Sequence, residues 1–397
     1  AEVGDGTMTC FLDGDGVLRW RPGSAWQAAM PAGRRGLRRG AAFAGEVVDQ
    51  FVFERLGLND ITTFLTGWDE KLTPDQGLRI LGDGGLAPFQ PDGKPLKRVL
   101  LLIHGTFSNS ENFAGALASV PDTDGQSFLE WARDKYDVIL AFNHPTLSLP
   151  PLLNALRLES LLGDLPGKID IVCHSRGGIV ARWWYEVTCR RPERLGKVVF
   201  AGSPLAGTSL AAPDKVRDVI EYFTNVGRVL KYGLGAGSLV FPFLSVAQGL
   251  MSLVCSATSF LASVPLADAV IGLVPGFTAQ SRVANNLELV ELRNRARPMP
   301  QYYAITSDFR PTDPGWYFWR HFTRLNAASL AAGLIFPKPH DLVVDHEAMT
   351  ELGRTPQGKE VLIPAAHRLD YGRNGKIHHV NYFSDLKSVQ FLKKSLA

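Results

Sequence analysis

The sequence predicts an α/β protein in which a mainly parallel β-sheet is flanked by helices. Short apolar runs bounded by turns, such as RVLLLI at residues 98–103, are typical of strands that are buried on both faces. Segments with helical periodicity alternate with these runs along residues 98–201. A β-α-β-α-β order of this kind brings the strands into one parallel sheet.

The expected elements follow one another in chain order. The predicted strands are residues 98–103, 136–144, 169–173, 196–208 and 299–308, and the predicted helices are residues 127–135, 150–166, 178–192 and 385–396. Pro151 near the start of the second helix fits the position at which proline is tolerated. Residues 342–349 are expected to close a short strand and begin a helix.

Residues 1–95 lack the alternating apolar runs and helical segments of the later sequence. They are interpreted as an N-terminal accessory region, partly β, that precedes a main domain over residues 96–397. TCFLDGDGVLRW predicts a hairpin that turns at residues 13–16. A segment from residue 46 to about residue 57 is predicted to be helical. The turn-rich LAPFQPDGKP marks the end of the region.

A long insertion is expected at about residues 208–282. Residues 232–267 contain no charged side chain, and Leu, Val, Phe, Ser and Ala dominate them. This length could span a bilayer. Two prolines and many Ser and Gly residues interrupt it, and it lies between two strands of one predicted sheet. We interpret it as a hydrophobic cap or lid, with plain core and a membrane-associated segment as the alternatives.

The strand, turn and helix at IDIVCHSRGG, residues 169–178, form the context of a nucleophile elbow with Ser175 at its tip. Cys173 stands where the first glycine of G-x-S-x-G is expected, and we expect it to be a buried free thiol. Gly177 and Gly178 leave room for the strand and the helix to approach each other.

A serine hydroxyl needs a base within hydrogen-bond reach and an acid that orients this base. Asp308, Asp341 and Asp345 are the candidate acids. Among the later histidines, His379 is favoured because it follows a late turn and precedes the last helix, although periodicity alone does not separate it from His378. The full set of later histidines is His321, His340, His346, His367, His378 and His379.

Residues 97–395 resemble the lipase and esterase branch of the α/β-hydrolase superfamily, including bacterial triacylglycerol lipase-like and lecithin:cholesterol acyltransferase-like members. The resemblance is carried by LLIHGTFS, CHSRG, DLVV at residues 341–344 and HVNYF at residues 379–383. In these families an Asp-Gly-Val-Val or Asp-Gly-Leu-Val element supplies the acid, and here Leu342 replaces its glycine.

The resemblance implies an α/β-hydrolase fold with a Ser175, Asp341 and His379 triad, and it favours Asp341 over Asp308. It also implies an oxyanion hole made by the backbone N–H groups of Thr106 and Arg176. His104 and His174 are read as structural residues. Phe107 and Leu205 are expected to line the substrate pocket, as are apolar residues of the insertion.

The function expected from these features is that of a serine hydrolase that cleaves carboxylic esters with a hydrophobic acyl or alcohol part. The same triad would serve a phospholipase, a thioesterase or an acyltransferase. A catalytically silent hydrolase-fold binding or effector module is the alternative from another class. A transient contact with a membrane or lipid interface through the insertion is a further expectation.

Composition narrows the partners. The chain has 42 Lys and Arg against 39 Asp and Glu residues, so no overall field favours nucleic acid. The basic run at residues 34–39 is interpreted as a solvated turn, with an anionic partner as the alternative. No motif predicts a metal or an organic cofactor. No targeting signal is visible and the four cysteines are widely separated, which favours a cytoplasmic location and leaves secretion open.

Overall fold

The computed structural model describes residues 6–12, 17–22, 46–53, 61–91, 93, 95–211, 221–222, 224–226, 274–282, 286–311 and 338–397. The chain divides into two compact units. One unit comprises Ala1–Thr63, Pro213–Leu273 and Asp313–Pro337, and the other comprises Phe64–Ala212, Val274–Thr312 and Lys338–Ala397. The basic run at residues 34–39 and the uncharged stretch at residues 232–267 lie outside the described residues. The solvated turn predicted for the first and the hydrophobic cap or lid predicted for the second therefore stay predictions.

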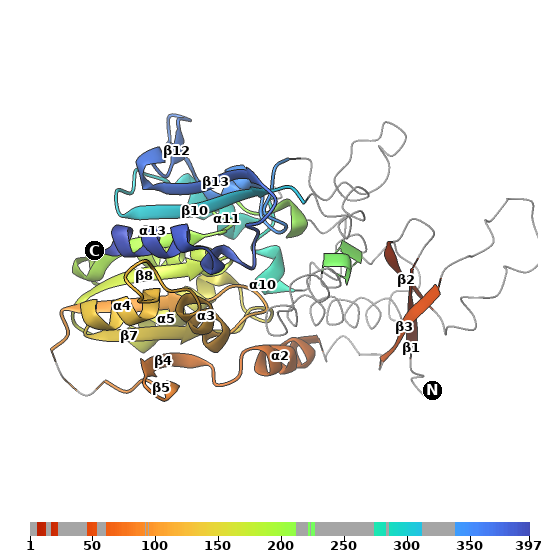
Figure 1. Ribbon diagram of the computed structural model, residues 1–397, viewed down its shortest axis with the longest axis horizontal. Helices are drawn as coiled ribbons and strands as arrows, with labels where there is room; N and C mark the ends of the chain where they lie inside the picture. The colour runs from red at the N-terminus through yellow and green to blue at the C-terminus, as the bar shows by residue number, and fades with distance from the viewer. Residues whose placement is uncertain are drawn as a thin grey trace, which may run out of the picture. The chain divides into compact units, whose positions relative to one another are not determined.

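The larger unit contains an eight-stranded sheet in the order β13-β10-β9-β8-β6-β7-β4-β5 (Figure 1). Its strands are β4 (Gly77–Gly82), β5 (Gly85–Pro88), β6 (Arg98–Ile103), β7 (Val138–Asn143), β8 (Lys168–His174), β9 (Leu195–Ala201), β10 (Tyr302–Phe309) and β13 (Arg368–Asn374). All the neighbouring pairs from β13 to β7 are parallel, whereas β4 is antiparallel to both β7 and β5. The mainly parallel sheet is therefore confirmed.

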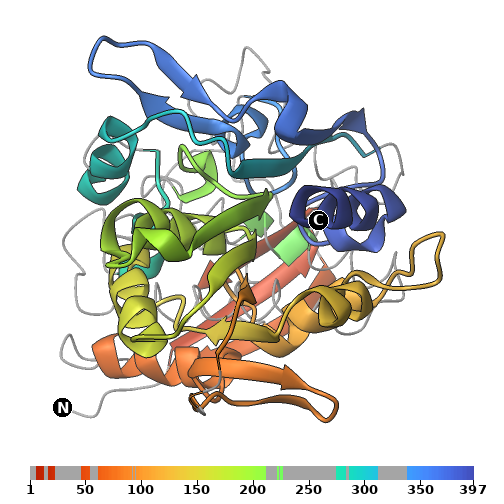
Figure 2. The same ribbon diagram turned by 90° about the vertical axis from the view of Figure 1, so that its left-hand side faces the viewer.

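The β4–β5 hairpin changes the predicted domain boundary. Both strands precede residue 95, yet they form one edge of the main sheet, shown in orange in Figure 2. The N-terminal region and the main domain therefore do not divide at residue 95. The sequence did not indicate this boundary because β4 and β5 are short, partly exposed strands without a continuous apolar run.

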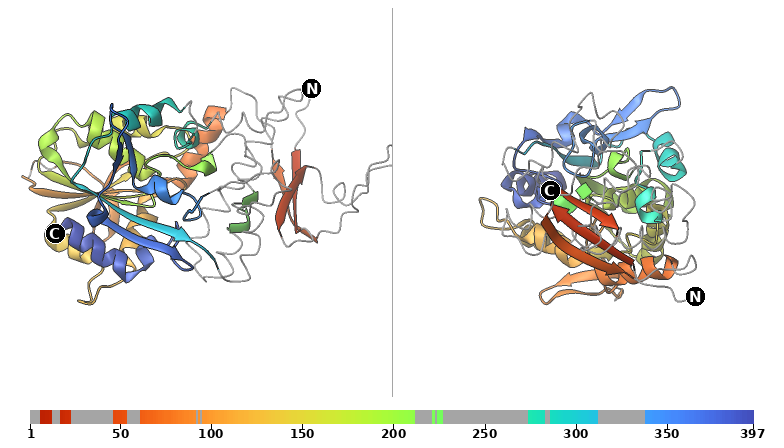
Figure 3. Two further views of the ribbon diagram at one scale, coloured as in Figure 1. Left: turned by 90° about the horizontal axis from the view of Figure 1, so that it is seen from above. Right: turned by 90° about the vertical axis from the view of Figure 1, so that its right-hand side faces the viewer.

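Helices cover both faces of the sheet (Figure 3). One face packs against α5 (Pro151–Leu162), α6 (Gly177–Trp183) and α11 (Leu287–Asn294). The other face packs against α3 (Ser110–Ala118), α4 (Phe128–Lys135) and α13 (Leu386–Leu396). The sequence explains the start of α4, because Ser127 and Glu130 form a reciprocal capping box.

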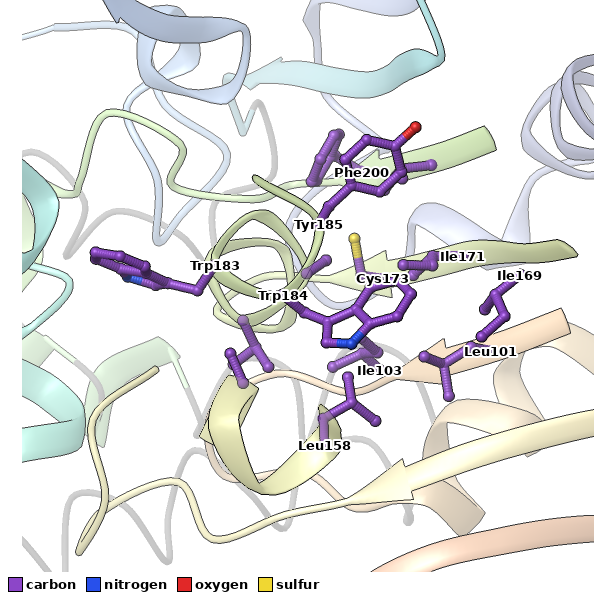
Figure 4. Packing of buried hydrophobic residues seen from close by; sticks show 14 of the residues in the cluster. Leu101, Ile103, Leu158, Ile169, Ile171, Cys173, Trp183, Trp184, Tyr185 and Phe200 are labelled. Carbon is purple, nitrogen blue, oxygen red and sulfur yellow. The ribbon is translucent and has the colours of Figure 1, made fainter. Parts of the chain in front are cut away.

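The strand leading to Ser175 lies at the centre of this core. Alternate residues of β6 and β8 enter opposite faces, so Ile103, Ile171 and Cys173 pack on the α5–α6 side. After α6 the helix continues as a wider turn over Trp184–Thr188. Figure 4 shows the ring of Trp184 directed toward these strands and Trp183 pointing away.

The remaining elements of the larger unit join these layers. The helix α2 (Ile61–Leu72) leads into the unit, and the short helix α10 (Pro275–Thr278) follows the insertion. A small antiparallel ribbon is formed by β11 (Glu351–Arg354) and β12 (Glu360–Leu362). The strand and helix expected over residues 342–349 are reduced to an isolated bridge between His340 and Asp345 and a short 3₁₀ turn, His346–Met349.

The smaller unit contains a three-stranded antiparallel sheet in the order β2-β1-β3. The strands β1 (Gly6–Leu12) and β2 (Leu18–Pro22) confirm the predicted hairpin. The helix predicted from residue 46 is wrong, because Glu46–Phe53 is the strand β3. The apolar residues of EVVDQFVF are β-branched or aromatic, which fits a strand better than a helix.

The hairpin packs with the insertion inside the same unit. The side-chain amide of Asn225 donates to the carbonyl of Leu18 and accepts from its N–H, both at 2.9 Å. Trp20 donates to the Thr224 hydroxyl, and Arg19 pairs with Glu221 at 3.0 Å. The N-terminal region and residues 213–273 of the insertion thus belong to one unit. No helix among the described residues is long and apolar enough to cross a membrane.

Candidate active site

Ser175 occupies a strained turn between β8 and α6. Its φ of 54° lies in the left-handed region, which residues with side chains rarely adopt and which is typical of a nucleophile elbow. Its N–H donates to the carbonyl of Ala201 at 2.9 Å. At Gly177 a Cβ would lie 2.4 Å from the carbonyl oxygen of Ile103, so the close approach of helix and strand requires glycine, as predicted. Cys173 is a fully buried free thiol, as expected.

His379 and Asp341 form a buried pair. The Nδ1 of His379 lies 2.8 Å from Oδ2 of Asp341, and the backbone N–H of His379 donates to the carbonyl of Asp341, also at 2.8 Å. The side chains are 6% and 0% exposed. Two bonds between the same residues fix the orientation of the imidazole, and with Nδ1 protonated they leave Nε2 as the basic nitrogen.

The carboxylate of Asp341 is fully hydrogen-bonded. Oδ1 accepts the N–H groups of Val343 and Val344 at 3.0 and 2.8 Å, and Oδ2 accepts the hydroxyl of Tyr382 at 2.8 Å. Burial raises the pKa of Asp341, but the charge and hydrogen bond of His379 and the two amide groups lower it below its ordinary value. The acid is therefore held as a carboxylate.

The sheet brings this pair next to Ser175. The ring of His174, the residue before Ser175, contacts the backbone carbonyl of His379 at 2.7 Å through Nε2. At Gly202, directly after the carbonyl that binds Ser175, a Cβ would lie 3.0 Å from Oδ2 of Asp341 and 3.2 Å from Nδ1 of His379. The His379–Asp341 pair therefore lies beside the residues that precede and support Ser175, at the carboxyl ends of β8 and β9.

The competing residues have other partners. Asp308 pairs with Arg310 at 2.9 Å. Asp345 accepts the N–H and the hydroxyl of Ser209. The ring of His378 packs edge-on against Phe309, with 5.1 Å between the ring centres. His321 lies outside the described residues, and of the alternatives that the structure describes, His379 and Asp341 are the two whose side chains share a hydrogen bond.

The His104–Thr106 turn adjoins the serine from the end of β6. At Gly105 a Cβ would lie 2.6 Å from Cβ of Ser175 and 3.3 Å from its Oγ. In the part of the chain that the structure describes, the backbone N–H groups of Thr106 and Arg176 donate to no other group. One of these N–H groups belongs to the residue after Gly105 and the other to the residue after Ser175, and their role as an oxyanion hole stays a prediction.

The histidines beside Ser175 stay neutral. His104 binds the carbonyl of Gly105 through Nδ1 and accepts the N–H of His144 through Nε2. Burial lowers the pKa of His104 to about 4 and that of His174 to about 3. Both rings thus act in the structure as neutral hydrogen-bonding residues, in agreement with the sequence reading.

The predicted pocket residues differ in setting. Phe107 has a φ of 60° and is half-buried, and its N–H donates to the hydroxyl of Thr146 at 3.4 Å. Leu205 is completely buried within the core cluster on the α5–α6 face. A role for either in binding substrate stays a prediction.

Sequence reasoning missed three contacts that order the site. The hydrogen bond that the Tyr382 hydroxyl donates to Asp341 has a partial signal in HVNYF, one of the segments that carry the resemblance. The Arg176 guanidinium is fully buried and donates to the carbonyls of Leu149 and Gly276. The side chain of Gln280 forms a hydrogen bond with Thr106, which is 174 positions away in the sequence, and no sequence motif predicts this contact. Among the described residues, no cluster of three His, Cys, Asp or Glu side chains is placed to hold a metal ion.

The eight-stranded, mainly parallel sheet with helices on both faces is the α/β-hydrolase fold. The model of the family described as "Domain of unknown function (DUF7379)" matches residues 84–397, and the chain belongs to this family. No curated protein matches the sequence.

Several solved structures are similar to the chain. Lipase BlEst2 of Bacillus licheniformis in its mature form is 15% identical, with 81% of this chain and 98% of that chain covered and a TM-score of 0.37. Lipase 1 from Pelosinus fermentans is 13% identical, with 76% and 99% covered and a TM-score of 0.41. The enol-lactonase from Burkholderia xenovorans LB400 is 11% identical, with 80% and 94% covered and a TM-score of 0.35. These likenesses concern the fold alone.

Proposed function

We propose that the chain is a serine hydrolase that cleaves carboxylic esters with a hydrophobic acyl or alcohol part. The observation that carries the proposal is the buried His379–Asp341 pair beside a serine in a strained turn, with the free N–H groups of Thr106 and Arg176 on either side. Each part answers one need of acyl transfer: a nucleophile, an oriented base and donors for an oxyanion.

In the proposed reaction, Oγ of Ser175 attacks the ester carbonyl while Nε2 of His379 accepts its proton. The carbonyl oxygen becomes an oxyanion that Thr106 and Arg176 stabilise. The alcohol leaves with the proton from His379, and an acyl group remains on Ser175. Water, activated by the same imidazole, then releases the acid, while Asp341 keeps Nδ1 of His379 protonated throughout.

Support for a hydrophobic substrate comes from the sequence of the insertion, which has no charge over residues 232–267. A panel of p-nitrophenyl esters of increasing acyl length, with and without a lipid interface, tests this part of the proposal. We expect kcat/KM to rise with acyl length. A preference for acetate, with no effect of the interface, would contradict it.

A fluorophosphonate probe tests the nucleophile directly. We expect the folded wild-type chain to form a covalent adduct on Ser175, and Ser175→Ala to abolish both labelling and ester hydrolysis. Ser384→Ala is the matched control, since Ser384 is exposed and its hydroxyl has no hydrogen bond to any residue that the structure describes. Undiminished esterase activity in Ser175→Ala would refute the proposed function.

A further inference from the structure

The side chain of Gln280 connects the end of the insertion to the turn that carries Thr106. Its Nε2 lies 2.8 Å from the carbonyl of Gly276 and 3.1 Å from the hydroxyl of Thr106. Gln280 is 5% exposed. Its backbone is also fixed, because its N–H donates to Phe277 and its carbonyl accepts the N–H of Thr208. The amide is therefore presented to Thr106 in one position.

The polarity of this contact follows from counting protons. The carbonyl of Gly276 only accepts, so the NH₂ group of Gln280, and not its oxygen, faces it. The second proton of that NH₂ group points to Thr106, and the alternative in which Thr106 donates to Oε1 of Gln280 is longer, at 3.4 Å. Thr106 thus accepts a hydrogen bond, and its own hydroxyl proton is left for another acceptor.

The residue with this unused proton stands beside the nucleophile. Thr106 follows Gly105, which packs against Ser175, and its backbone N–H also donates to no group in the described part of the chain. Gly276 further accepts the Nε of Arg176 at 3.3 Å. The segment Gly276–Gln280 therefore holds, through side chains, both residues whose N–H groups flank Ser175.

We propose that Thr106 donates its side-chain hydroxyl as well as its backbone N–H to the oxyanion, and that Gln280 is the positioning residue that keeps this hydroxyl a donor. The inference rests on the ester hydrolysis proposed above. In the attack, Oγ of Ser175 bonds to the carbonyl carbon and the π electron pair moves to the oxygen, while the serine proton goes to His379. Thr106 keeps its proton and only donates a hydrogen bond.

The first experiment removes the hydroxyl without changing the shape. In the full chain, Thr106→Val is expected to lower kcat for a p-nitrophenyl ester about a hundredfold with KM nearly unchanged, because the lost bond forms only in the transition state. Thr106→Ser restores the hydroxyl and is expected to keep kcat within a few-fold of wild type. Thr188→Val makes the same chemical change on the turn after α6, where the Thr188 hydroxyl bonds to Ala155, and controls for packing.

The second experiment reverses the polarity at Gln280. A carboxylate only accepts, so Gln280→Glu draws the Thr106 proton toward residue 280 and is expected to lower kcat as Thr106→Val does. The double variant Thr106→Val with Gln280→Glu is expected to lose no more than the worse single variant. A mere loss of packing would instead give additive losses and a change in KM.

The outcomes separate this inference from the proposed function. If Ser175→Ala abolishes activity while Thr106→Val keeps kcat within twofold of wild type, the hydroxyl is not a donor to the oxyanion and the inference is overturned. An equal loss in Thr106→Ser would overturn it as well. If Thr106→Val does not fold, Gln280→Glu decides alone, and unchanged kcat in that folded variant overturns the role of Gln280.

Discussion

The carboxylate of Asp341 has no freedom to rotate at the candidate site. Two backbone N–H groups hold one oxygen, and His379 and Tyr382 share the other. The two oxygens of Asp341 therefore have different donors: Oδ1 accepts only backbone N–H groups, whereas Oδ2 accepts only side-chain groups. The imidazole is therefore oriented by the peptide chain that follows Asp341 as much as by the acid itself.

This arrangement makes the amide variant of Asp341 informative. In Asp341→Asn the amide oxygen must stay with the backbone N–H groups, which turns the NH₂ group toward His379 and favours the wrong tautomer. We expect kcat/KM to fall about ten-thousandfold, as for the corresponding change in other triads. Asp308→Asn is the matched control, since Asp308 pairs with Arg310 instead, and should stay within about twofold. Equal losses in both variants would contradict the assignment of the acid.

At the scale of elements, the loop after His340 shows how a departure from a motif is accommodated. Leu342 stands where the resembling families have glycine, and its φ is 100°, in the region that favours glycine. The side chain is nevertheless completely buried. The strained backbone lets Val343 and Val344 turn their N–H groups to Asp341, and burial of the leucine side chain offsets the strain.

Two substitutions separate strain from burial at Leu342. Both Leu342→Ala and Leu342→Gly lose a buried side chain, and we expect each to lower the free energy of unfolding by about 2 kcal/mol or more. Glycine relieves the strain that alanine keeps, so Leu342→Gly should be more stable than Leu342→Ala by about 1 kcal/mol. Urea denaturation of the two variants measures the difference. Glycine ordinarily destabilises a fold relative to alanine, because its backbone loses more conformational freedom on folding. If Leu342→Ala is the more stable variant, the backbone at residue 342 is not strained.

The elements with a strong local signal could be predicted from sequence. The strands β6 to β9 are apolar runs between turns, and Ser175 has its own strand, turn and helix context. The strand β3 was mistaken for a helix although its β-branched and aromatic residues favour a strand, and β4 was missed because it is short, partly exposed and without a continuous apolar run. Asp341 could be favoured over Asp308 only by resemblance, since the choice depends on which loop reaches His379. Gln280 could not be found, because its partner is 174 residues away.

For the whole molecule, the buried histidines determine how the fold responds to acid. Burial lowers the pKa of His144 well below its ordinary value, and it also lowers those of His104 and His378 to about 4 and of His174 and His340 to about 3. In the unfolded chain these groups take up protons near pH 6.5. The unfolded state therefore binds more protons than the folded state below that pH.

The sign of this linkage predicts loss of stability on acidification. Each buried histidine removes up to about 1.4 kcal/mol per pH unit as the pH falls from 6.5 toward its folded-state pKa. We expect the urea midpoint to be nearly constant from pH 8 to 7 and to fall steeply between pH 6.5 and 4.5. The variant His378→Gln should flatten the slope by about one proton. A midpoint that does not change down to pH 5 would contradict the buried neutral state.

The bond between Asn225 and Leu18 also bears on the synthesis of the chain. Leu18 lies on β2, an edge strand, and the amide of Asn225 occupies both of its outward backbone groups. The two residues are 207 positions apart, so at about 5–20 residues per second the ribosome needs roughly ten to forty seconds to deliver the second after the first. During that interval the edge of the hairpin presents unpaired groups to other nascent strands. Slower translation or a missing chaperone should therefore lower the yield of folded protein, even though neither changes the free energy of unfolding of the finished fold.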